Sequence, residues 1–219
     1  MVLPVLYRDA AVAIVDKPAG LAVEADGPES VVRRLATELA PLGGRAWPRV
    51  VHRLDTDTSG CLAVALNDAA ANALASAFEA GSVEKEYLAI VAGAPDDEGK
   101  LDTAYGKDPR DGRRWTTRLK TPRRARLSWR VEERLLGAAL VRIVLDTGRT
   151  HQIRVQLSEA GFPLLGDAVY GVPAPPACGL KRQALHAFRL AFPLPTGQRV
   201  DVRAPLPDDL AAALRALRS

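Results

Sequence analysis

Hydrophobic positions along the chain follow two different periods. Segments that alternate or stay apolar over three to eight residues predict β-strands; they are Val5–Tyr7, Ala11–Asp16, Cys61–Leu66, Glu86–Val91, Trp115–Leu119, Ala125–Glu132, Ala138–Leu145, Ala184–Leu190 and Arg199–Arg203. Helical spacing is found in Ser30–Leu39, Asp68–Ala80, His151–Ala160 and Asp208–Leu217. The strands outnumber the helices and mostly follow one another. This pattern favours an α+β fold with a central mixed, largely antiparallel sheet flanked by helices, not a regular βαβ repeat.

Local signals mark the ends of the predicted helices. Asn67 is a suitable N-cap, and Gly81 is a common helix terminator. A further helix opens at Thr150 and ends at Gly161. In the last helix, Asp208 lies in the first turn, where a carboxylate complements the helix dipole.

Composition places the chain among ordinary globular proteins. It has 219 residues, of which 47% are hydrophobic and 26% charged, and no apolar run approaches the roughly 18 residues of a membrane span. Cys61 and Cys178 form neither a disulfide framework nor a zinc-binding spacing, so we expect a reduced, cytoplasmic protein. No repeat or long linker divides the sequence, and a single domain over residues 1–219 is predicted.

The basic residues are mostly arginine. The net charge is +4, and arginine suits phosphate because its planar fork donates two parallel hydrogen bonds; coding bias in a GC-rich genome explains the same composition. The densest cation run, Gly106–Arg126, includes Trp115 and lies beside Trp129. Such interleaving is typical of nucleic-acid surfaces, although a solvated β-hairpin has the same pattern. The candidate phosphate contacts in this run are Arg113, Arg114, Arg123 and Arg124.

The segment "RVVHRLDTDTSGCLAVAL" (Arg49–Leu66) joins a polar turn to an apolar strand. If the segment is extended, Arg53 lies on the same face as Asp55, two residues away, and holds it as the anion. The polar turn that follows could orient the carboxylate through backbone and hydroxyl hydrogen bonds. A structural Arg–Asp pair in a turn is the alternative.

Two further segments contain candidate functional residues. In "DTGRTHQIRVQL" (Asp146–Leu157), Thr150, His151 and Arg154 share a helix face near free backbone N–H groups, where an anion binds well. An ordinary polar helix face is the alternative. Tyr87 opens an apolar strand in "VEKEYLAI", and a tyrosine there is also typical of a core.

Taken together and in order, five motifs closely resemble the RluA-type pseudouridine synthases. They are "HRLDTDTSG", "KEY", "GRTHQIRVQL", "GDAVYG" and "RQALHA", and the resemblance extends from Val15 to Pro207. Gln156 departs from the family, which often has His there, and this bears on substrate more than on chemistry. The N-terminal S4 RNA-binding domain of many relatives is missing, so we expect a catalytic domain alone.

The resemblance implies conversion of a uridine in RNA to pseudouridine, with no cofactor and no metal. Asp55 would be the catalytic carboxylate, Arg154 its partner, and Tyr87 would lie against the target base. Asp55 would attack C1′, add to C6 or remove a sugar proton, and the sequence leaves these routes open. Because the base must leave its stack, Arg53 would hold the flipped nucleotide or occupy the gap. The remaining predicted RNA contacts are His52, Arg149, Thr150 and His151.

Two other functions fit parts of the sequence. A non-catalytic RNA-binding protein on the same fold needs the basic surface, but not Asp55, Tyr87 and Arg154 together. A glycosidase needs two carboxylates, for which Asp55 and Asp57 could serve, but aromatic residues make up only 5% of the chain. Resemblance to small members without an S4 domain favours tRNA as substrate, with large-subunit rRNA as a second possibility, and a monomeric enzyme.

Overall fold

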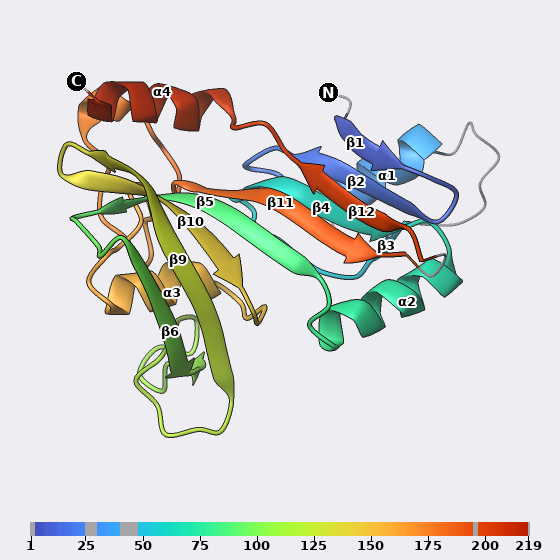
Figure 1. Ribbon diagram of the computed structural model, residues 1–219, viewed down its shortest axis with the longest axis horizontal. Helices are drawn as coiled ribbons and strands as arrows, with labels where there is room; N and C mark the ends of the chain where they lie inside the picture. The colour runs from blue at the N-terminus through green and yellow to red at the C-terminus, as the bar shows by residue number, and fades with distance from the viewer. Residues whose placement is uncertain (1–2, 25–29, 40–47, 195–196, 219) are drawn as a thin grey trace. The chain divides into compact units, whose positions relative to one another are not determined.

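In the computed structural model the strands outnumber the helices and mostly follow one another along the chain, as the hydrophobic pattern predicts (Figure 1). The structure describes residues 3–24, 30–39, 48–194 and 197–218. The chain forms two compact units. The first unit comprises Met1–Lys85 and Ala187–Pro205, and the second comprises Glu86–His186 and Leu206–Ser219.

The first unit is built on antiparallel strand pairs. Its strands are β1 (Val5–Arg8), β2 (Val12–Lys17), β3 (Arg49–Val50), β4 (Ser59–Ala65), most of β11 (Leu185–Pro193) and β12 (Arg199–Arg203). β2 pairs with both β1 and β4, β3 also pairs with β4, and β12 pairs with β11. Every residue of β4 is buried, and burial on both faces explains why its sequence is apolar without interruption from Cys61 onward.

The helices found among the described residues of the first unit are α1 (Val31–Leu39) and α2 (Asp68–Glu79). The predicted cap of α2 is confirmed, because the Asn67 side chain accepts a hydrogen bond from the Ala70 N–H at 2.8 Å. The predicted terminator is confirmed as well: Gly81 has a φ of 72°, a left-handed conformation that glycine adopts without strain. Leu74 of α2 is buried in the core of this unit.

The second unit contains a sheet of long antiparallel strands. β5 (Glu84–Ala92), β10 (Ala138–Leu145), β9 (Arg124–Leu135) and β6 (Glu98–Ala104) lie in that order, and each neighbouring pair is antiparallel (Figure 1). β7 (Gly106–Lys107) pairs with β8 (Trp115–Thr116) in a separate two-stranded sheet. The helices of this unit are α3 (Gln152–Glu159), the short 3₁₀ helix η2 (Pro176–Cys178) and α4 (Asp208–Arg218).

The sheet of long strands has one buried and one charged face. Along β9, Ala125 and Leu127 are buried while Arg124 and Arg126 between them are exposed, as the period of two requires. Ala125 packs in a small core with Val155 of α3. The face toward α3 is therefore apolar, and the opposite face carries charges.

The predicted fold class is confirmed: the protein is α+β, with a largely antiparallel sheet and helices beside it. β10 and β12 have the bounds predicted for them. β6 was not predicted, since its sequence "EGKLDTA" is mostly polar. The strand expected over Trp115–Leu119 ends at Thr116, and the helix expected from Thr150 begins at Gln152. Both differences have physical reasons in the candidate site.

Candidate functional site

The loop that carries Asp55 is held by hydrogen bonds to residues at the end of β2 and just after it. Lys17, whose side chain is buried, donates a hydrogen bond from Nζ to the Thr56 carbonyl at 2.8 Å. The Gly20 N–H donates to the same carbonyl at 3.0 Å, and the Thr58 N–H donates to the Asp55 carbonyl at 3.0 Å. The half-buried Asp55 therefore lies in a turn whose backbone position is set from both sides.

Lys17 was missed as a functional residue, although it lies in the "VDKPAGLAV" stretch that opens the family resemblance. Its ammonium also donates to the carbonyls of Pro18 at 2.9 Å and Leu21 at 2.8 Å. A buried ammonium requires such partners. These bonds explain its burial, which the sequence pattern alone does not indicate.

His52 and Arg53 precede this turn in different environments. The His52 ring stacks on Phe78 with centroids 4.5 Å apart, and its Nε2 accepts a hydrogen bond from the Ala63 N–H at 2.9 Å. Burial and the charge of Lys85 hold the pKa of His52 well below its usual range, so the ring is neutral. Arg53 is exposed. RNA contact by either residue stays a prediction.

In the second unit, Arg154 forms a buried, two-pronged ion pair with Asp167. Nε and Nη2 of Arg154 donate to the two carboxylate oxygens at 2.6 and 2.9 Å. The Asp167 carboxylate also accepts from the N–H groups of Val169 and Tyr170 at 2.9 and 3.1 Å. Burial alone would raise the pKa of Asp167, but Arg154 and these backbone donors hold that pKa below its usual value.

Several of the predicted residues lie around the ring of Tyr170. The guanidinium groups of Arg154 and Arg114 lie 5.2 and 5.0 Å from the ring centroid, within cation–π range. The Tyr170 hydroxyl accepts a hydrogen bond from the Trp115 N–H at 3.0 Å and lies 3.2 Å from Nδ1 of His151. Tyr170 was not among the predicted site residues, but the "GDAVYG" motif contains both it and Asp167.

Thr150 and His151 lie before helix α3, not on its face, and the expectation that they share a helix face with Arg154 is wrong. His151 has a φ of 56° and a ψ of 21°, a left-handed conformation that an α-helix cannot continue. The Thr150 carbonyl accepts a hydrogen bond from the Tyr105 hydroxyl at 2.6 Å. Tyr105 and Tyr170 thus hold the two residues from either side. A non-glycine residue in this conformation is uncommon and points to a functional constraint.

The carboxylate of Glu159, at the end of α3, anchors the basic segment. It accepts hydrogen bonds from the Thr116 hydroxyl at 2.7 Å, from the Thr117 N–H at 2.8 Å and from the Thr117 hydroxyl. The Thr117 N–H is thereby taken up by a side chain instead of a neighbouring strand. This is the physical reason that β8 stops at Thr116.

The four predicted phosphate contacts of the basic segment fall into two kinds. Arg113 and Arg124 form ion pairs with Asp111 at 3.3 Å and with Asp102 at 2.8 Å. Arg114 lies over the Tyr170 ring, and Arg123 lies 5.6 Å from the centre of the Trp115 ring. The sequence could not distinguish these two kinds, because Asp102 is 22 residues away from its partner.

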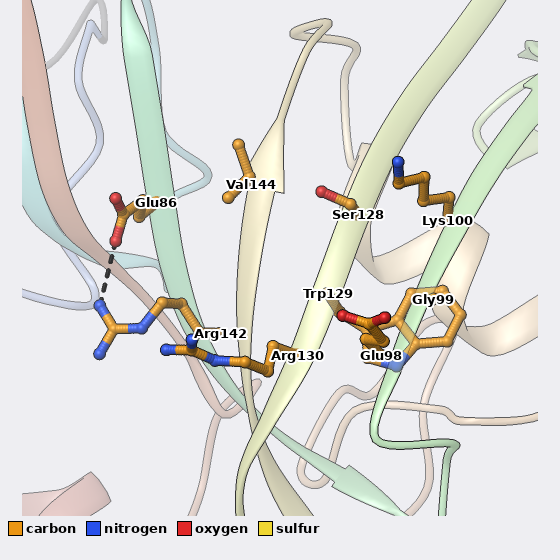
Figure 2. A pocket seen from close by; sticks show the side chains of 9 residues that line it. All are labelled: Glu86, Glu98, Gly99, Lys100, Ser128, Trp129, Arg130, Arg142 and Val144. Carbon is orange, nitrogen blue, oxygen red and sulfur yellow. Dashed lines mark hydrogen bonds and ion pairs between the residues drawn. The ribbon is translucent and has the colours of Figure 1, made fainter.

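Tyr87 is buried on β5, where its register partner is Ile143 of β10. The neighbouring Glu86 lies on the opposite face of the sheet of long strands, in a groove of about 650 Å³ (Figure 2). The groove is lined by Glu86, Glu98, Gly99, Lys100, Ser128, Trp129, Arg130, Arg142 and Val144. Arg142 pairs there with Glu86 at 3.0 Å. None of these lining residues belongs to the predicted site.

The predicted residues are thus distributed over both units. His52, Arg53 and Asp55 belong to the first, and the others belong to the second. Among the residues that the structure describes, His, Cys, Asp and Glu form no group that could hold a metal ion. No described helix is long and apolar enough to cross a membrane.

Comparison with known proteins identifies the class to which this fold and these motifs belong. A sequence model of the family described as RNA pseudouridylate synthase matches residues 11–159. The chain belongs to the RNA pseudouridylate synthase family, and the resemblance inferred from its motifs is confirmed at that level.

Individual relatives are similar over nearly the whole chain. "Ribosomal large subunit pseudouridine synthase D" of Nitrosomonas europaea is 38% identical over 227 residues, which cover 99% of this chain and 66% of the relative. "Uncharacterized RNA pseudouridine synthase YlyB" of Bacillus subtilis is also 38% identical, with 100% and 74% covered. The solved structure of human RNA Pseudouridylate Synthase Domain Containing 1 superposes with a TM-score of 0.82 at 29% identity, covering 96% of this chain and 87% of that one. The chain spans slightly less than two thirds of the Nitrosomonas relative.

Proposed function

We propose that this protein is an RNA pseudouridine synthase. In this reaction the bond between uracil N1 and ribose C1′ breaks, the base turns, and C5 bonds to C1′. The proton on C5 leaves and N1 gains one, so the product is an isomer of the substrate and no group donor or oxidant is needed. Family membership across residues 11–159, which include the Asp55 turn, carries this proposal.

Asp55 is the proposed catalytic carboxylate. A carboxylate that reacts must be held in one place, and the hydrogen bonds of Lys17 and Gly20 to Thr56 support that role. Tyr87 and Arg154 are proposed to serve the same reaction, Tyr87 against the target base and Arg154 at the family position that partners the catalytic carboxylate. The buried pairing of Arg154 with Asp167 supports a cation of fixed orientation.

The proposed substrate is a uridine in structured RNA. The sequence favours tRNA, whereas the name of the Nitrosomonas relative specifies the large ribosomal subunit. Mapping pseudouridines in tRNA and in large-subunit rRNA, from cells with and without the gene, decides between the two. A site that disappears with the gene identifies the substrate.

Replacing Asp55 by Asn tests the proposed chemistry. Asp55→Asn keeps the size of the side chain and removes its charge, so product formation should be abolished while most RNA affinity remains, because phosphate contacts dominate binding. The matched control is Asp57→Asn, an exposed carboxylate two residues further along the same turn. It loses the same charge and should stay active.

The assay is release of tritium from RNA labelled at uridine C5, with pseudouridine identified in the digested product. More than a trace of activity in Asp55→Asn would contradict the catalytic assignment. Wild-type protein that binds RNA but makes no pseudouridine in total cellular RNA would instead favour the non-catalytic RNA-binding alternative.

A further inference from the structure

The arginines on and beside β9 differ in whether they have a counter-ion. Arg124, Arg130 and Arg134 each form an ion pair with a carboxylate, at distances of 2.6 to 2.9 Å. Within the described part of the chain, Arg123, Arg126 and Arg149 have no such partner. The missing partner matters because neighbouring charges of one sign create a positive potential, which raises the local concentration of anions.

These three arginines are close together. Arg149 donates a hydrogen bond from Nε to the Arg124 carbonyl at 3.1 Å, which holds its guanidinium against the strand between Arg123 and Arg126. Burial, and then the charges of Arg123 and Arg126, lower the pKa of Arg149. Like charges therefore repel one another in this cluster, and a bound anion would relieve that repulsion.

The surroundings indicate which anion would fit. Asp146, whose N–H donates to the Arg126 carbonyl at 3.2 Å, forms no ion pair with the cluster. Arg123 lies over Trp115, which in turn stacks on Tyr105 with centroids 5.7 Å apart. These contacts hold the Arg123 guanidinium in place, and guanidinium groups without a carboxylate partner suit a phosphate, to which they donate parallel hydrogen bonds.

We propose that Arg123, Arg126 and Arg149 form a phosphate-binding site for the sugar–phosphate backbone of the RNA. This inference rests on the proposed function, since it takes RNA to be the ligand. It adds Arg126 to the contacts expected from the sequence. It also leaves Arg124 out of the phosphate-binding site, because the charge of Arg124 is already compensated by Asp102.

The test compares two triple variants with the same loss of charge. One replaces Arg123, Arg126 and Arg149 by Gln, and the other replaces the carboxylate-paired Arg124, Arg130 and Arg134 by Gln. Affinity for bulk tRNA is measured over a series of salt concentrations. Each lost phosphate contact should reduce the slope of log affinity against log salt by roughly 0.7–0.9. We expect a reduction of about 2 to 3 for the first triple and of less than about 1 for the second.

A variant with one substitution keeps the test valid if the triple variant does not fold. Arg126 is exposed, and among the described residues its guanidinium forms no recorded hydrogen bond or ion pair, so Arg126→Gln should fold normally and still reduce the slope by roughly 0.7–0.9. Equal slope changes in the two triples, or an unchanged slope in Arg126→Gln, would overturn the proposal. If the slopes change as expected but the protein makes no pseudouridine, the proposed function is wrong and the phosphate-binding site is supported. If the protein makes pseudouridine but the slopes do not change, the phosphate-binding site is wrong and the proposed function is supported.

Discussion

Replacing Asp167 by Asn should destabilise the second unit strongly. Both side chains of the Arg154–Asp167 pair are almost fully buried, with exposed fractions of 7% and 0%. Asn keeps the size of Asp and can still accept hydrogen bonds, but it leaves the guanidinium charge buried without compensation. Breaking a buried pair in this way costs roughly 3–5 kcal/mol. Because Asn preserves some of the hydrogen bonds, we expect a loss of about 3 kcal/mol in the free energy of unfolding, measured by urea titration at about pH 7.

The stability difference between wild type and Asp167→Asn should depend on pH. The folded-state pKa of Asp167 lies below that of an unfolded aspartate, which is about 3.9. The stabilisation is therefore complete above about pH 4 and is lost as the pH falls through the folded-state pKa. The difference between wild type and Asp167→Asn should be constant from about pH 7 to about pH 5 and shrink under more acidic conditions. A loss below about 1 kcal/mol at neutral pH would refute the reasoning, as would a difference that is larger at about pH 3.

Arg154→Lys separates charge from geometry at this pair. Lys keeps the positive charge but not the planar fork that donates to both oxygens of Asp167. Stability should fall less than in Asp167→Asn, whereas turnover at saturating RNA should fall strongly. Unchanged turnover would mean that Arg154 has a structural role only.

Two further predictions concern residues that the sequence did not single out. Tyr170→Phe keeps the ring beside the guanidinium groups but leaves the Trp115 N–H without its acceptor, so stability should fall by about 1 kcal/mol and RNA affinity should weaken; an unchanged urea midpoint would contradict this. Lys17→Met removes the donor to Thr56 and should reduce product formation more than RNA affinity, because the Asp55 turn loses a fixed point. Single-turnover rates and binding titrations on the folded protein measure the two effects, and equal losses in both would argue against a positioning role.

Part of this protein was predictable from the sequence, because the signals are local. Ala138–Leu145 is apolar at every position except Arg142 and forms β10 with those bounds. Asn67 and Gly81 mark the ends of α2 through bonds to residues at most a few positions away. The motif around Asp55 indicated the family, which the comparisons confirm.

Tertiary structure decided what depends on partners distant in the sequence. Glu159 ends β8 from 42 residues away, and Lys17 holds Thr56 across 39 residues. The pairing of Arg124 with Asp102 likewise decides which arginines at the end of the basic segment remain uncompensated. A side chain's hydrogen-bonding capacity is evident from its type, but the identity of its partner depends on which elements the folded chain brings into contact.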